Sequence, residues 1–348
     1  MLGEDGALAL PTGITLALVL PLFVRKAVAF QVVLTGASAT VAACVRTRAP
    51  AGPTETISKQ DAQRFPLVGS AALLSLFALL KLLPPELVSA VLRAYLAALG
   101  ALAIAQCFHP SHVVPSLHQR DCTVSLPTLP LIGRLAPSVG SIALHIASAC
   151  FCAWYWHSQH WLANNVIAAA LALQFVERAA LERVKDGLLL LCGLFVYDCL
   201  WVFGTPVMLT VARGIDGPIK LLFPKSFAPA SQLSKSDFSM LGLGDIVLPA
   251  LFCAIAFRID IVAKRSPKAG LNAHAHYFAF SAAGYVLGLV ATEVSLQFFN
   301  AAQPALLYIV PAVVGAVFAR AASLREALKV YRFEAEVAEA DSSDSQVK

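Results

Sequence analysis

Two aspartates inside strongly apolar segments are the residues of this chain best placed to do chemistry. Asp198 lies in the apolar run Leu188–Met208, and Asp245 lies in Met240–Phe257. An ionised carboxylate at bilayer depth costs roughly 2.5–3.5 kcal/mol on insertion scales, so an acid there is expected to have a function. Two such acids in successive segments could share one proton, as the carboxyl pair of an aspartic protease does. The pattern predicts peptide-bond hydrolysis inside a membrane.

The composition predicts an all-α polytopic membrane protein. The chain has 348 residues, of which 58% are hydrophobic and only 14% charged, and its mean hydropathy is +0.72. Soluble domains carry about a quarter charged residues. The net charge of +5 is spread between the apolar segments, so we expect no nucleic-acid partner. The eight cysteines have no CxxC spacing, and neither a disulfide framework, a metal site nor another cofactor is predicted.

Nine apolar stretches are predicted to span the membrane, because each approaches the length of about 20 residues that a spanning helix needs. They are Ala27–Val45, Phe65–Leu83, Leu87–Phe108, Pro137–Trp156, Trp161–Val176, Gly187–Met208, Met240–Phe257, Tyr277–Phe299 and Ala302–Ala322.

A tenth apolar stretch, Ala7–Val24, is separated from Ala27–Val45 only by Arg25 and Lys26. Two residues cannot turn a helical hairpin in lipid, and one helix over both stretches would be far longer than a bilayer. Either Ala7–Val24 is a removed signal sequence, or it is the first span and Ala27–Val45 lies partly outside the membrane. Acidic residues near the start weaken the signal-sequence interpretation.

Basic residues predict the orientation. With nine spans and the N-terminus outside, the loops placed in the cytosol contain Arg46, Arg48, Lys59, Arg64, Arg120, Arg134, Arg178, Arg183, Lys185, Lys264, Arg265 and Lys268. The predicted organisation is an N-terminal segment 1–26, N-terminal helices 27–185, catalytic helices 186–322 with an outer loop 209–238, and a disordered cytosolic tail 323–348.

The neighbours of the two acids suggest how a site could be built. Tyr197 could donate a hydrogen bond to a carboxylate or to a substrate. Gly242 and Gly244 flank Asp245 in a predicted helix interior, where glycine is unfavourable, so they suggest a close backbone approach. Pro304 frees a backbone group at the start of the last span, which is tolerated where the backbone lines a cavity. The third intramembrane acid, Glu293, has no motif around it, and it is predicted either to have a hydrogen-bonded structural role or to face a cavity, rather than to act in catalysis.

These motifs resemble the signal peptide peptidase family, whose members are related to presenilin. The sequence has Tyr-Asp in one span, Gly-Leu-Gly-Asp in the next and Gln-Pro-Ala-Leu at the last, and longer stretches such as FVYDCLWVFGTPVM and HWLANN are similar too. The resemblance implies that Asp198 and Asp245 are the catalytic pair. It also implies that Tyr197, Gly242, Leu243, Gly244, Gln303, Pro304, Ala305 and Leu306 shape the active site.

The resemblance further implies an endoplasmic reticulum enzyme, with the N-terminus lumenal, that cleaves signal peptide remnants and other type II-oriented membrane segments. The residues after Asp344 contain no dilysine retrieval signal, which departs from the animal members. The predicted partners are transmembrane peptides and the lipid bilayer, and a homo-oligomer is left open. The alternatives are a presenilin-like subunit that needs partner proteins, an ion or proton transporter, and a membrane chaperone.

Overall fold

A computed structural model describes residues 28–47, 55–108, 139–225, 237–265, 271–299 and 303–335. The predictions for residues 1–26 therefore lie outside the described residues. The helices are α2 (Val28–Arg46), α3 (Lys59–Leu82), α4 (Pro85–Cys107), α6 (Val139–Ser158), α7 (Trp161–Arg178), α8 (Val184–Gly204), α9 (Val207–Gly214), α10 (Gly244–Arg265), α11 (Tyr277–Phe299), α12 (Leu306–Ser323) and α13 (Ala327–Tyr331).

Each of the nine apolar stretches forms a helix, with ends shifted by a few residues. Local sequence explains several of these ends. Ser58 and Asp61 form a capping box at the start of α3, and Pro85 begins α4, where its missing N–H would have no helical partner. Among the described residues, six helices are long and apolar enough to cross a membrane: α3, α4, α8, α10, α11 and α12. This is consistent with a polytopic membrane protein, and the count of nine spans stays a prediction.

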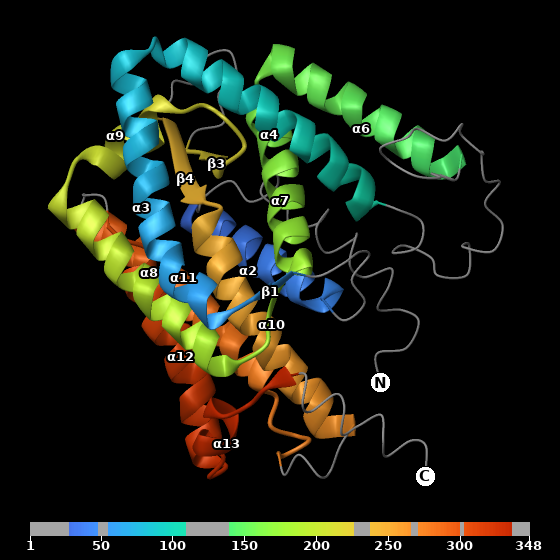
Figure 1. Cartoon of the computed structure of the whole chain (residues 1–348), viewed down its shortest axis with the longest axis vertical. Coiled ribbons are helices and arrows are strands. Elements are labelled where there is room, and N and C mark those ends of the chain that lie inside the picture. The colour runs from blue at the N-terminus through green and yellow to red at the C-terminus, as the bar shows by residue number, and fades with distance from the viewer. Residues whose placement is uncertain are drawn as a thin grey trace.

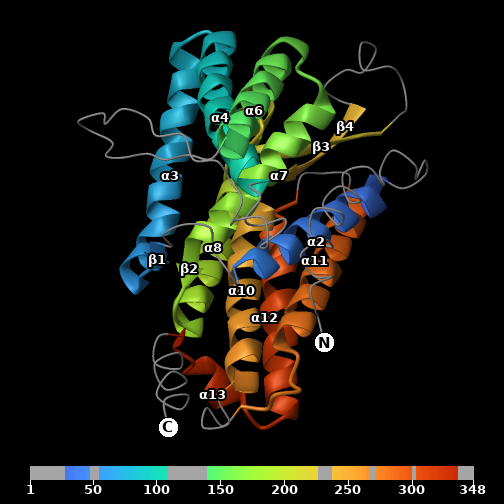
Figure 2. The same cartoon turned by 90° about the vertical axis from the view of Figure 1, so that its right-hand side faces the viewer.

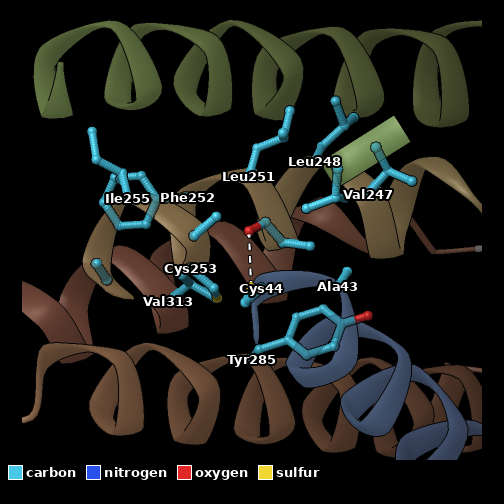
Figure 3. Packing of buried hydrophobic residues seen from close by; sticks show 14 of the residues in the cluster. Ala43, Cys44, Val247, Leu248, Leu251, Phe252, Cys253, Ile255, Tyr285 and Val313 are labelled. Atoms are coloured by element: carbon cyan, nitrogen blue, oxygen red, sulfur yellow. Dashed lines mark hydrogen bonds between the residues drawn. The ribbon is translucent and has the colours of Figure 1, made fainter. Parts of the chain in front are cut away.

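Helix α10 is the centre of the molecule. It contacts α2, α7, α8, α11 and α12, and 83% of its most apolar 18-residue stretch is buried inside the protein. Figure 2 shows α10 running beside α8, with α12 and α11 next to it. In the close view, the Cys44 thiol of α2 donates to the Ala250 carbonyl of α10 (3.3 Å), and Tyr285 of α11 lies nearby (Figure 3). The helix that carries Asp245 is thus held on all sides by other helices.

The region predicted as an outer loop, 209–238, is more ordered than expected. It contains most of α9, followed by strand β3 (Lys220–Pro224), which pairs antiparallel with β4 (Phe238–Gly242). Residues Leu221 and Phe223 of β3 are buried. Strand β4 leads directly into α10 (Figure 1). The predicted span Met240–Phe257 was therefore wrong at its start, because 240–242 belong to a strand and the helix begins at Gly244.

The predicted disordered tail is also partly structured. Helix α13 follows α12, and Glu334 forms a β-bridge with Arg183 at the start of α8. A second two-stranded sheet lies at the same end, where β1 (Glu55–Ile57) pairs parallel with β2 (Ala179–Leu181). The prediction was wrong for residues 327–335 because the apolar Val330 and Phe333 bury themselves against the helix ends. Residues 336–348 lie outside the described residues.

Candidate active site

Asp198 is buried in α8, and its carboxylate reaches the start of α12. Its Oδ2 atom accepts a hydrogen bond from the backbone N–H of Leu306 at 3.1 Å. Leu306 is the first residue of α12, so this N–H has no partner within its own helix. Pro304 and Ala305 form the turn before it, with their carbonyls accepting from Leu307 and Ile309. The Pro-Ala-Leu sequence thus presents a backbone donor to the Asp198 carboxylate.

Asp245 lies in the first turn of α10, immediately after the β3–β4 hairpin. Gly242 is the last residue of β4, and a Cβ atom added there would lie 3.2 Å from the Asp245 Oδ2 atom. The prediction that both glycines lie in a helix interior was therefore wrong. Gly242 ends a strand and leaves room for the carboxylate, whereas Gly244 begins the helix and has only Leu248 within 4 Å of such a Cβ.

The two carboxyl groups come together from helices that are neighbours in the bundle. The charge of Asp198 acts on the Asp245 carboxyl group. Helix α8 contacts both α10 and α12. The site therefore combines two acids with one backbone N–H donor, and three separate helices supply these groups. The roles of Asp198 and Asp245 as a catalytic pair stay a prediction.

Tyr285 is a neighbour of the site that the sequence did not predict. Pro249 has no N–H, so the carbonyl four residues earlier, that of Asp245, loses its helical hydrogen bond. The buried Tyr285 hydroxyl of α11 donates to this carbonyl at 3.1 Å. Tyr285 thus takes the place of the missing proline N–H and fixes the backbone of Asp245. The sequence does contain a sign of this contact. A proline four residues after Asp245 leaves the Asp245 carbonyl without a helical partner, so a donor from another element is required.

Tyr197 does not bind the carboxylates. Its hydroxyl donates instead to the Gly69 carbonyl of α3 at 3.4 Å. The next turn of α8 continues this contact, because the Trp201 indole N–H donates to the Ser70 hydroxyl at 3.2 Å. The predicted bond to a carboxylate is not formed, because adjacent residues on a helix point in different directions, so Tyr197 faces α3 while Asp198 faces α12. A bond from Tyr197 to a substrate stays a prediction. Tyr197 serves to dock α3 on the helix that carries Asp198.

The remaining predicted residues lie around the acids. The Leu243 N–H donates to the Ile219 carbonyl at 3.0 Å, which joins the end of β4 to the residue before β3. Gln303 precedes Pro304 and is partly exposed. Glu293 is partly exposed on α11 and has no hydrogen bond to another described residue. Neither Gln303 nor Glu293 is brought to the two carboxylates by a contact among the described residues.

Close packing of α11 and α12 places the N-terminus of α12. A Cβ added at Gly284 would lie 2.5 Å from the Ala312 carbonyl oxygen, and one at Gly288 would lie 2.6 Å from the Ile309 Cα. Two glycines four residues apart allow helix backbones to approach closely in membranes. The sequence contains this Gly-x-x-x-Gly pattern in the eighth predicted span, and it would have predicted the contact.

Comparison with known proteins places the chain in a family. A family model described as signal peptide peptidase matches residues 50–337. The chain is 35% identical over 306 residues to a signal peptide peptidase of Mus musculus, covering 84% of this chain and 77% of the mouse protein. The Homo sapiens signal peptide peptidase gives the same figures. A probable intramembrane protease of Schizosaccharomyces pombe is 32% identical over 294 residues, which are 84% of this chain and 88% of that protein. The chain belongs to the signal peptide peptidase family of intramembrane proteases.

Proposed function

We propose that this protein hydrolyses peptide bonds within transmembrane segments by a two-aspartate acid–base mechanism, and that signal peptide remnants are among its substrates. The observation that carries the proposal is the meeting of Asp198, Asp245 and the Leu306 N–H at the junction of α8, α10 and α12. All of these groups lie within residues 186–322, which we propose as the catalytic part of the chain.

Two neighbouring carboxyl groups in a membrane interior can act as general base and general acid. Both cannot ionise without a large repulsion, so we expect the pair to hold one proton. The ionised member accepts a proton from a water molecule, which attacks the scissile carbonyl carbon. The protonated member donates a hydrogen bond to the carbonyl oxygen and stabilises its developing charge. The Leu306 N–H keeps the Asp198 carboxylate in one orientation during these steps.

The outer edge of β4 can receive the substrate in an extended conformation. In the antiparallel register, Leu222 faces Met240, and the backbone N–H of Lys225 donates to the backbone carbonyl of Asp237 at 2.7 Å. Hydrogen-bonded and non-hydrogen-bonded pairs alternate along the strands, so Leu222 and Met240 form a pair without mutual hydrogen bonds. The main-chain groups of Met240 and Gly242 consequently point away from β3. Among the described residues this sheet has only two strands, so no described strand covers that edge. A segment added there would pass beside Asp245 with its amides exposed.

The overall activity can be tested with purified protein. We expect it to cleave a transmembrane peptide derived from a signal sequence in detergent or in vesicles. A transition-state analogue of aspartic proteases should inhibit this cleavage, because such compounds bind far more tightly than substrates. An absence of cleavage, or cleavage that the analogue leaves unchanged, would contradict the proposed function.

Local unwinding of the substrate should limit the rate. A helical segment keeps its carbonyls within its own hydrogen bonds, so it must open before water can attack. Leucine-rich sequence across the scissile bond should slow cleavage, whereas Gly, Ser or Pro there should speed it. The gain should be about fivefold for one Gly, less for Ser and more than tenfold for Pro, because a helix interior Gly costs about 1 kcal/mol against Ala and Pro about 3. The measurement is kcat and Kd for matched peptides, and equal kcat values would contradict the prediction.

Tyr285→Phe should lower activity without removing the fold. The change deletes only the hydroxyl that donates to the Asp245 carbonyl. Leaving a buried acceptor unpaired costs about 1–3 kcal/mol, and here the cost falls on the backbone of a proposed catalytic residue. We expect kcat to fall about three- to thirtyfold, with KM nearly unchanged. Tyr308→Phe removes another membrane hydroxyl, one bonded to Ser295, and serves as the matched control. Equal losses in the two variants would contradict a specific role of Tyr285.

We also propose that the protein lies in the endoplasmic reticulum membrane with the hairpin lumenal and the C-terminal end cytosolic. Support comes from the basic residues at the ends of α2, α10 and α12, namely Arg46, Arg265 and Arg320. Protease treatment of intact microsomes should destroy a tag placed after Lys348 and spare one inserted within 226–236. The opposite pattern would reverse the orientation of the acceptable substrates.

A further inference from the structure

Two adjacent asparagines of α7 bind the main chain of β3. The Asn165 carboxamide bonds to Leu222 twice, because its Oδ1 accepts from the Leu222 N–H at 2.7 Å and its Nδ2 donates to the Leu222 carbonyl at 2.8 Å. The Asn164 Nδ2 donates to the Lys220 carbonyl at 2.8 Å. Both asparagines are buried, and Tyr155 of α6 donates to the Asn164 Oδ1 at 3.0 Å. Figure 2 shows α7 beside the hairpin.

The register explains why asparagine suits this position. Leu222 and Met240 form a pair without mutual hydrogen bonds, so the N–H and carbonyl of Leu222 point outward, towards α7. A carboxamide carries one acceptor and one donor group side by side, as a neighbouring strand does. Pro224 lies two residues after Leu222, so its backbone N also points away from β4, and its missing N–H removes no hydrogen bond of the β3–β4 pair. The side chains of α7 thus occupy the outer edge of β3 as a third strand would.

The connection from this edge to Asp245 is short. Strand β3 is paired with β4 along its length, and only Leu243 separates β4 from α10. The Leu243 N–H is itself bonded to the Ile219 carbonyl, just before β3. A shift of β3 along or away from α7 would therefore move β4, its free edge and the Asp245 carboxyl together.

We infer that Asn164 and Asn165 are positioning residues for proteolysis: they occupy the outer edge of β3, which fixes the hairpin beside Asp245 and leaves the edge of β4 as its open edge for the substrate. This inference rests on the proposed function. It assigns the Asn-Asn pair to the active site although neither side chain contacts the two carboxyl groups. Asn165 is the stronger member, because it binds both main-chain groups of one residue.

The variant Asn165→Leu tests this inference, because leucine has a similar size and cannot pair with Leu222. We expect kcat for a transmembrane peptide to fall about tenfold or more, since displacements of about 1 Å can cost a hundredfold. We also expect products cut at neighbouring bonds, seen by mass spectrometry, because an unfixed hairpin would accept the substrate in more than one register. Hydrogen exchange of the β3 amides should accelerate in the same variant.

Two further variants make the outcome decisive. Gln174→Leu removes a buried carboxamide from the same helix, which bonds to Glu177 and not to the hairpin, and it should keep a single cut site. Asn165→Asp keeps an acceptor for the Leu222 N–H but, when ionised, places a second carboxylate oxygen against the Leu222 carbonyl. It should therefore also lower kcat, and it replaces Asn165→Leu if that variant does not fold. A single unchanged cut site with unchanged kcat in the Asn165 variants overturns the inference. A wild-type protein that cuts nothing contradicts the proposed function instead. Hydrogen exchange of the β3 amides still tests whether Asn165 holds β3 in place.

Discussion

Replacing either Asp198 or Asp245 by asparagine should abolish cleavage. Each change keeps the size of the side chain and removes one of the two groups between which the proton is shared. Residues that act as a unit show strongly non-additive losses, with falls of about 10⁴ or more for single members of a catalytic set. We therefore expect each single variant to lose at least about a thousandfold in kcat, and the double variant to be no worse than either single one.

Glu293→Gln is the matched control for this experiment. Glu293 is also an acid in a candidate membrane span, but it forms no hydrogen bond with another described residue. We expect this variant to cleave at close to the wild-type rate. Thermal unfolding should separate loss of chemistry from loss of fold, because a folded Asp198→Asn protein should unfold at close to the wild-type temperature. Substantial cleavage by either aspartate variant would rule out the shared-proton pair.

The sequence predicted the helices well, because apolar length is local information. A helix such as α11 was predicted from Tyr277 to Phe299, as the structure has it, since apolar length alone determines a span. The Pro304–Leu306 turn was predicted to lie at the site, and the Leu306 N–H does bind Asp198.

The contacts that were missed join residues distant in the chain. The sequence predicts a loop where β3 lies, because the pairing of β3 with β4 and with Asn165 depends on partners beyond any local pattern. Tyr285 was overlooked since its role follows from the gap that Pro249 leaves in another helix. Tyr197 was expected to donate to a carboxylate or to a substrate, whereas the direction of its side chain on α8 takes its hydroxyl to the Gly69 carbonyl.

The close contact of α11 with α12 gives the second large prediction. A Cβ at Gly288 would lie 2.6 Å from the Ile309 Cα and 3.2 Å from its backbone N. Because backbone atoms cannot rotate away, Gly288→Val must push α12 off α11. Ile309 is one turn after Leu306, so the displacement carries the Leu306 N–H away from the Asp198 carboxylate. A movement of about 1 Å at a catalytic group can cost a hundredfold.

We therefore expect Gly288→Val to lower kcat/KM about a hundredfold and to destabilise the protein by about 1–3 kcal/mol, the usual cost of overpacking. Gly315→Val is the matched control, since an added Cβ there meets nothing within 4 Å and valine is no worse a helix former than glycine. Rates should be compared per folded molecule, with thermal unfolding measured in the same detergent. If Gly288→Val matched the control in both stability and rate, the approach of α12 to α11 would not be what places the Leu306 donor at Asp198.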